Sequence, residues 1–300
     1  MIEIIDLKFH GNEQTIAAFL VRTSDGPVLI ETGPHSSLPS LEKGLAAHGV
    51  TLQSIQHVFL SHIHLDHAGA AWYFAQSGAQ IYVHPFGEMH LANPKRLMES
   101  ARRIYKEDMD RLWGQMEAIP EQQLTAVDHE TVISIGDTNF KAWHTPGHAV
   151  HHIAWQVNDV LFAGDVAGVK IGKGLVVPPC PPPDINVEDW QNSIQLMRSL
   201  DIHQLYLTHF GAIANIDEHL TELEKCLLEW ANWMYPYWEQ GAEQASVRPL
   251  FQKYVGQQLL AAGIDMEGLK RYESANPSWM SVAGLMRYWS KKNRSANSKL

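Results

Sequence analysis

Short apolar stretches, each bounded by turn residues or polar sequence, recur along the chain as far as residue 212. Such stretches are typical of β-strands that are half or fully buried. The strands predicted in this way are residues 2–8, 15–22, 28–31, 55–60, 80–84, 131–135, 140–144, 153–157, 160–163 and 205–208. Helical periodicity appears at residues 40–48, at residues 70–76, and from Asp184 or Asn186 to Leu200. Strands interspersed with helices predict an α/β fold.

Two further parts of the chain have helical periodicity alone. Residues 86–120 are rich in charge and methionine, and Leu97, Ala101 and Tyr105 follow a helical spacing. From residue 217 onward, one helical face is followed by three more predicted helices at residues 251–262, 266–272 and 277–289. We therefore expect one domain at residues 1–212, with a helical insertion at about 86–120, and a C-terminal helical region at residues 213–300.

The predicted strand at residues 55–60 leads directly into a cluster of histidines. His62, His64, Asp66 and His67 follow within a few residues, in the stretch Ser61-His-Ile-His-Leu-Asp-His67. Imidazole and carboxylate groups are the usual ligands of zinc and comparable divalent metals. A surface loop that is merely rich in histidine is the alternative, and the regular spacing disfavours it. The loop offers more ligands than a single ion needs from one segment.

Three more candidate ligands, His148, Asp165 and His209, each follow an apolar strand-like run. Together with the histidine loop, this order of motifs resembles the metallo-β-lactamase superfamily of hydrolases over roughly residues 1–212. The resemblance implies a four-layer αββα sandwich with the catalytic domain at residues 1–212. It also implies that two metals are bound, with Asp165 bridging them. His62, His64 and His148 would hold one metal, and Asp66, His67 and His209 the other.

The resemblance also implies a reaction. Two divalent ions per chain, zinc in the first place with iron or manganese as alternatives, would share a water and produce a bridging hydroxide. Asp66 would be the catalytic residue that positions this hydroxide. The motif order and the helical C-terminal region look most like the glyoxalase II (hydroxyacylglutathione hydrolase) branch. The residues by which that branch holds glutathione do not stand at recognisable places. We therefore expect a hydrolase of a small acyl thioester or ester, with no substrate-binding residue identified.

Two other enzymatic functions are compatible with these motifs. Some nucleases of the superfamily have the same ligand set and a short helical tail. Persulfide dioxygenases would bind a single iron through His62, His148 and Asp165. A metal analysis separates the dioxygenase from the hydrolases, and an RNA cleavage assay separates the nuclease.

Composition favours a small-molecule enzyme. The net charge of −10 and the absence of a basic stripe argue against a nucleic-acid partner. No apolar run is long enough for a membrane span, and no secretory signal is visible, so we expect a cytoplasmic protein with its two cysteines unpaired. The final tripeptide Ser298-Lys299-Leu300 would direct a eukaryotic protein to peroxisomes. The aromatic residues of the C-terminal region are expected in the core, with a substrate pocket or a homodimer contact as alternatives.

Three smaller features complete the expectations. Glu31 stands where the superfamily usually has aspartate in an Asp-Thr-Gly motif, and His151 and His152 are expected beside the ligands rather than among them. Residues 177–183 are rich in proline and are expected to form a rigid wall near the site. Buried packing is favoured over a pocket wall for four methionines, Met89, Met98, Met109 and Met116.

Overall fold

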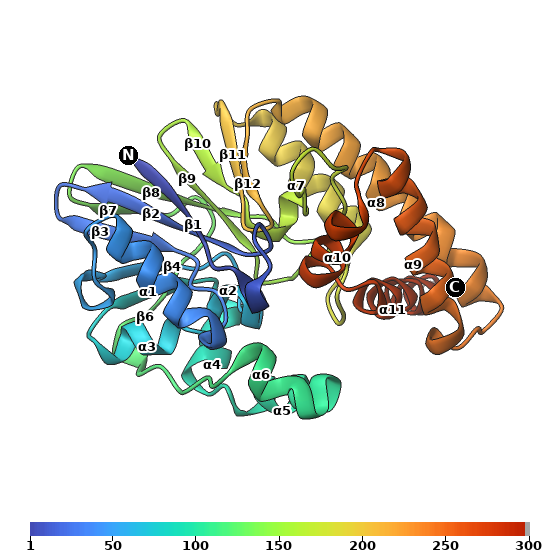
Figure 1. Cartoon of the computed structure of the whole chain (residues 1–300), viewed down its shortest axis with the longest axis horizontal. Helices are drawn as coiled ribbons and strands as arrows, with labels where there is room; N and C mark the ends of the chain where they lie inside the picture. Colours follow the sequence, from blue (N-terminus) through green and yellow to red (C-terminus); the bar gives the residue numbers. More distant parts are fainter. Residues whose placement is uncertain (298–300) are drawn as a thin grey trace.

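Two six-stranded sheets form the centre of the molecule (Figure 1). The computed structural model describes residues 1–297, so the tripeptide Ser298-Lys299-Leu300 lies outside the described residues. The first sheet contains, in order, β1 (Ile2–Asp6), β2 (Ala17–Thr23), β3 (Gly26–Ile30), β4 (His57–Phe59), β5 (Gln80–Val83) and β6 (Leu124–Ala126). The second contains β12 (Gly211–Ile213), β11 (Gln204–Leu207), β10 (Val160–Phe162), β9 (Ile153–Val157), β8 (Thr138–His144) and β7 (Val132–Ile135).

The two sheets pack face to face through large aromatic side chains. Phe59 of the first sheet stacks on Phe140 of the second, with 4.3 Å between ring centroids. Phe19 and Phe162 make a similar contact at 5.1 Å. All four rings are fully buried. Side chains alternate along each strand, so the opposite faces of both sheets carry a second set of apolar residues that must be covered.

Helices cover both outer faces. Leu41 and Leu45 of α1 (Leu38–Ala47) and Phe74 of α3 (Ala71–Gln76) share an apolar cluster with the outer residues of the first sheet. Trp190 and Ile194 of α7 (Val187–Ser199) do the same on the second sheet. Asn186 caps α7 by accepting a hydrogen bond from the Asp189 amide at 3.1 Å. This is the four-layer αββα sandwich that the sequence predicted, and that prediction is confirmed.

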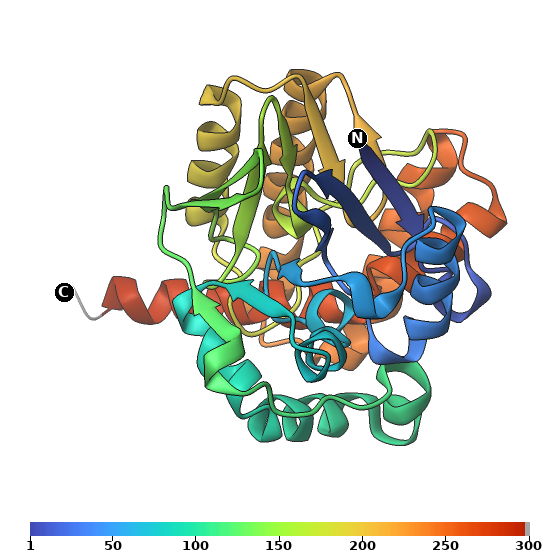
Figure 2. The ribbon, with the colours of Figure 1, turned by 90° about the vertical axis from the view of Figure 1, so that its left-hand side faces the viewer.

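The C-terminal region is helical throughout its described length. It consists of α8 (Ile216–Glu239), α9 (Gln244–Ala261), α10 (Met266–Ala275) and α11 (Ser278–Asn297). The sequence predicted that this helix starts at residue 251, but α9 begins earlier, at Gln244. The helix continues through Pro249, although the proline has no backbone N–H and one helical hydrogen bond is lost. Figure 2 shows the end of α11 projecting away from the rest of the molecule. Within residues 1–297, no helix combines the length and the apolar character needed to cross a membrane.

Three helices lie between β5 and β6, where the insertion was predicted: α4 (Pro85–Ala92), α5 (Lys95–Tyr105) and α6 (Met109–Trp113). The helical part ends earlier than residue 120, because Gly114 takes a positive φ of 70° against His35. Met109 and Met116 are buried, as predicted, and Met98 is half-buried. The prediction was wrong for Met89, which is 67% exposed on the outer side of α4.

Candidate metal centre

The structure brings all seven predicted ligands together at one edge of the sandwich. His62 and His64 lie in the loop after β4, and α2 (Leu65–Ala68) continues that loop with Asp66 and His67. The other three come from later strand ends: His148 from the loop between β8 and β9, Asp165 from the turn after β10, and His209 from the turn between β11 and β12. Residues far apart in sequence thus meet because their strands end on the same side.

One group of ligand atoms contains His62, His64, His148 and Asp165. His62 Nε2 lies 2.8 Å from His64 Nδ1 and 3.2 Å from His148 Nε2. His148 Nε2 also lies 3.2 Å from Asp165 Oδ2. Three imidazole nitrogens and one carboxylate oxygen converging in this way match the donor set and number of a tetrahedral zinc site.

The second group contains Asp66, His67 and His209. Asp66 Oδ2 lies 3.5 Å from His209 Nε2 and 3.9 Å from His67 Nε2. The other oxygen of Asp165, Oδ1, lies 3.2 Å from His67 Nε2 and 3.3 Å from His209 Nε2. Asp165 therefore presents one oxygen to each group, which is the geometry of a bridging carboxylate.

Unpartnered polar atoms show that the residues fit bound cations. His67 Nε2, His209 Nε2 and Asp165 Oδ1 are buried and have no hydrogen-bond partner among the described residues. Burying such atoms without a partner costs about 1–3 kcal/mol each. Asp165 Oδ1 lies 3.2 Å from His67 Nε2 and 3.3 Å from His209 Nε2, so a divalent cation at the second group would satisfy all three atoms.

Hydrogen bonds on the far side of the rings orient the histidines. His148 Nδ1 donates to the carbonyl oxygen of Pro179 at 2.8 Å, and His209 Nδ1 donates to that of Thr15 at 2.5 Å. His62 Nδ1 lies 2.9 Å from Ser61 Oγ. In each case the Nδ1 contact leaves Nε2 facing the cluster, which is how outer contacts fix the ring of a metal-ligating histidine.

Glu31 is not one of the seven clustered residues, but it contacts the histidine loop. It is 1% exposed and takes a positive φ of 64°, which turns its side chain toward the histidine loop. Its Oε1 accepts a hydrogen bond from the Ser61 amide at 3.1 Å, and Oε2 lies 3.4 Å from His67 Nδ1. Glu31 therefore fixes both the start of the loop and one of its histidines.

His151 and His152 stand beside the two groups and belong to neither. His152 Nε2 accepts a hydrogen bond from the Asp165 amide at 3.2 Å, so it fixes the turn that carries the bridging carboxylate. The His151 ring is buried, with its centroid 5.9 Å from that of His64. The proline-rich segment contributes the Pro179 carbonyl described above. The roles of the Pro179 and Thr15 carbonyls could not be predicted from the sequence, since every residue carries a backbone carbonyl.

Acidic groups dominate the electrostatics of the second ligand group, whereas burial lowers the pKa of His62, His64 and His148 in the first. Burial opposes a charge on His67, but Asp165, Glu31 and Asp66 outweigh it and raise its pKa well above the ordinary value. Burial likewise opposes ionisation of Asp66, but His67 and His209 outweigh it and hold its pKa at about 2. Asp66 is therefore ionised at neutral pH. The negative charges that favour a proton on His67 would equally favour a metal cation in its place.

The cluster is open to solvent at His64 and Asp66. Five of the seven residues are buried, whereas His64 and Asp66 are partly exposed. The Asp66 side chain is 21% exposed. A substrate can therefore reach the cluster from the side of His64 and Asp66.

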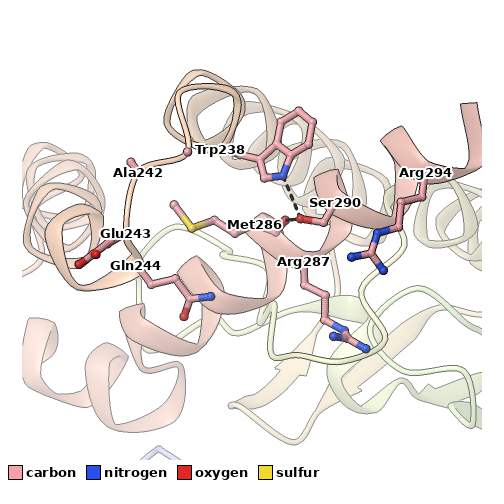
Figure 3. A pocket seen from close by; sticks show the side chains of 9 residues that line it. Trp238, Ala242, Glu243, Gln244, Met286, Arg287, Ser290 and Arg294 are labelled. Carbon is pink, nitrogen blue, oxygen red and sulfur yellow. Dashed lines mark hydrogen bonds between the residues drawn. The ribbon is translucent and has the colours of Figure 1, made fainter. Parts of the chain in front are cut away.

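A separate groove lies among the C-terminal helices (Figure 3). It has a volume of about 570 Å³. Its lining is formed by Trp238, Gly241, Ala242, Glu243, Gln244, Met286, Arg287, Ser290 and Arg294. It contains none of the seven clustered residues, so it is not the approach to the candidate metal centre.

Comparison with known proteins agrees with this geometry. The sequence profile of the Metallo-beta-lactamase superfamily matches residues 11–209, and the chain belongs to this superfamily. Over 179 residues it is 27% identical to the metallo-beta-lactamase fold-containing protein ST1585 of Sulfurisphaera tokodaii, covering 57% of this chain and 67% of that protein. It is 23% identical over 221 residues to the probable metallo-hydrolase YqjP of Bacillus subtilis, covering 67% of this chain and 69% of YqjP.

A solved structure extends the likeness of the fold over nearly the whole chain. The metallo-beta-lactamase family protein TTHA1429 of Thermus thermophilus superposes with a TM-score of 0.65 at 18% identity, covering 97% of this chain and 94% of that one. This match includes the C-terminal helical region as well as the sandwich.

Proposed function

We propose that the protein is a metal-dependent hydrolase that cleaves a small acyl thioester or ester. The observation that carries this proposal is the pair of ligand groups that share Asp165, with Asp66 at the open side. Membership of the superfamily supports it, as does the likeness to YqjP, a probable metallo-hydrolase. The donor set suits two divalent ions, zinc foremost, with iron or manganese as alternatives.

When bound, the two ions would supply Lewis acidity, which polarises an acyl carbonyl and acidifies water. His62, His64 and His148 would hold one ion, and Asp66, His67 and His209 the other, with Asp165 between them. Asp66 has a second task, because it is one of the two clustered residues that are partly exposed. Its carboxylate is ionised at neutral pH and can orient the attacking water by accepting a hydrogen bond that holds the water's proton.

The choice of an acyl substrate rests on three supports. The motif order and the C-terminal helices resemble the glyoxalase II branch. The net charge of −10 disfavours nucleic acid. The half-buried aromatic side chain of Tyr105 lies within electrostatic reach of Asp66, at the partly exposed part of the cluster. We propose a cytoplasmic enzyme acting on a small molecule, with no nucleic-acid or membrane partner.

The test is a substrate panel combined with metal analysis. The pure protein is assayed on acyl thioesters, esters, RNA and single-stranded DNA, and its metal content is determined. We expect acyl hydrolysis and close to two ions per chain. Cleavage of nucleic acid without acyl hydrolysis would replace this function by that of a nuclease. One iron per chain, unchanged by His209→Ala, would favour the dioxygenase.

Asp66→Asn tests the assigned role of the carboxylate. We expect kcat to fall by about 10²-fold or more, the scale of lost proton handling, with metal still bound through the amide oxygen. Asp201→Asn, on an exposed loop, is the matched control and should leave kcat unchanged. An Asp66→Asn enzyme with normal metal content and normal kcat would remove Asp66 from the mechanism.

A further inference from the structure

Three half-buried aromatic rings from separate parts of the chain meet in one place. Tyr105 ends α5, Trp113 ends α6, and Trp279 lies in the first turn of α11. The Tyr105 ring lies 5.1 Å from that of Trp113 and 5.9 Å from that of Trp279. In Figure 1, α5 and α6 lie below the sandwich and α11 to its right. We call Tyr105, Trp113 and Trp279 the aromatic wall.

The aromatic wall is connected to the candidate metal centre through Tyr105, whose hydroxyl is affected by the charge of the partly exposed Asp66. Tyr105 and Trp113 pack against the apolar cluster that contains Leu65, the residue directly before Asp66. Trp113 also stacks on Phe9, with 5.5 Å between centroids. Burial raises the pKa of Tyr105, and the negative charge of the nearby Asp66 raises it further. Tyr105 therefore lies within the electrostatic reach of the ligand that is exposed to substrate.

The Tyr105 hydroxyl lacks a strong hydrogen-bond partner. It donates to the thioether sulfur of Met280 at 3.5 Å. A thioether is a weak acceptor, so this contact costs little to exchange for a carbonyl or carboxylate oxygen. The hydroxyl also stays protonated at any pH at which the enzyme would work, because its pKa is raised. It is a donor that is free to turn toward an incoming oxygen.

We propose that Tyr105 donates a hydrogen bond to an oxygen of the substrate, while Trp113 and Trp279 flank an apolar acyl group. This proposal rests on the proposed acyl hydrolysis and makes it more specific. The substrate class becomes thioesters or esters of acids with an aliphatic or aromatic group of moderate size. Tyr105 determines the orientation of the substrate, and Trp279 contributes to the preference for a certain length of the acyl group.

The first experiment compares Tyr105→Phe with Tyr235→Phe. Tyr235 is the control because its hydroxyl bonds to Glu239 on the outer side of α8. We expect Tyr105→Phe to lower kcat/KM by about 5- to 10-fold, the scale of one hydrogen bond, with unchanged metal content and thermal stability. Tyr235→Phe should leave kcat/KM unchanged. A Tyr105→Phe enzyme with wild-type kcat/KM on every acyl substrate that is hydrolysed would overturn the role of the hydroxyl.

The second experiment uses Trp279→Ala and a series of thioesters from acetyl to octanoyl. We expect the preference for the longer acyl groups over acetyl to fall by about 10-fold, because one wall of the apolar site is lost. An unchanged preference would show that the acyl group lies elsewhere.

Calorimetric titration with hexanoate and acetate separates this inference from the proposed function, since binding needs no turnover. We expect the wild type to bind hexanoate more tightly than acetate, and both Tyr105→Phe and Trp279→Ala to weaken hexanoate binding. If acyl substrates are hydrolysed but hexanoate binds equally to all three proteins, the inference fails and the proposed function stands. If no acyl substrate is hydrolysed but hexanoate binding follows the expected pattern, the proposed function fails and the apolar acid site stands.

Discussion

At the scale of single residues, the cluster depends on a carboxylate outside the ligand set. Glu31 is buried between the Ser61 amide and His67 Nδ1, so its side chain links the start of the histidine loop to one of the ligands. A carboxylate in this place orients the imidazole and increases its basicity. The superfamily pattern has the shorter aspartate here, whereas Glu31 makes these contacts with a longer side chain from a backbone with a positive φ of 64°.

The first prediction is that Glu31→Gln weakens metal binding by about 10- to 100-fold. The amide oxygen can still accept the bond from Ser61, but the negative charge beside His67 is lost. Affinity is measured by competition with a chromogenic chelator. Glu99→Gln, on the exposed face of α5, is the control and should bind metal as the wild type does. Equal affinity in Glu31→Gln would mean that Glu31 only holds the loop.

The second prediction concerns pH. In the metal-free protein, Asp165 and the other acidic groups outweigh burial and raise the pKa of His67 and His209. Their protonation therefore stabilises the metal-free fold, and this stabilisation is lost as the pH rises from about 6.5 through the raised values. In the loaded protein protons compete with metal, so stability should rise over the same range.

The measurement is the melting temperature between about pH 7 and pH 8.5, with zinc and with a chelator. Histidines such as His62, whose pKa is lowered by burial, stay neutral in the folded protein in this window, so they affect the curves with and without metal alike. Parallel curves with and without metal would contradict the assignment of His67 and His209 as ligands.

The ligand residues could be predicted from sequence because four of the seven share one loop and the others end apolar strands. The contacts that orient them could not. His209 depends on the Thr15 carbonyl, 194 residues away, and a carbonyl has no side-chain signature. Tyr105 was visible only as one position of a helical stripe, since its neighbours Trp113 and Trp279 come from other elements.

At the scale of elements, the proline-rich segment connects a ligand to the last helix. The Pro179 carbonyl accepts the bond from His148, and the next residue, Cys180, is buried against α11. The two backbones approach so closely that a Cβ at Gly284 of α11 would overlap the Cys180 carbonyl oxygen. Only glycine permits this contact.

The third prediction compares two glycines of the C-terminal helices. Gly284→Ala should destabilise the protein by roughly 1–3 kcal/mol, the scale of overpacking, and weaken metal binding through the Pro179 carbonyl. Gly256→Ala in α9 is the control, because nothing lies within 4 Å of a Cβ there. It should stabilise the protein by about 0.5–1 kcal/mol through helix propensity. Both are measured by urea denaturation, and a neutral Gly284→Ala would disprove the close approach.

The length of an element and the apolar residues around it determine whether the element could be predicted from the sequence. The long amphipathic helices, such as α8, have several turns of periodic leucines and were predicted. β6 and β12 have three residues each and lack the longer apolar run that made the equally short β4 and β10 visible. They are strands because a neighbouring strand pairs with them, and that pairing is a property of the sheet.

At the scale of the whole molecule, the C-terminal helices complete the fourth layer of the sandwich. Leu220, Leu223 and Leu227 of α8 are fully buried in the same apolar cluster as Leu161 and Leu205 of the second sheet. The sequence predicted both the helical face and the strands. It could not show that they face one another, because periodicity identifies a buried face without identifying its partner.

The last prediction follows from this shared cluster: a chain ending at residue 215 should not form a stable, active core. Each buried leucine of α8 contributes about 2 kcal/mol, and domains of this kind are stable by only about 5–15 kcal/mol in total. Removing α8 alone therefore takes away a large part of the stability, and removing α11 also exposes Cys180 and the segment that holds His148. We expect the truncated chain to aggregate, and limited proteolysis of the full chain to produce no resistant fragment ending near residue 215. A soluble, fully active fragment of that length would show that residues 213–300 are a detachable module. It would also show that the aromatic wall has no part in catalysis, because the fragment lacks Trp279.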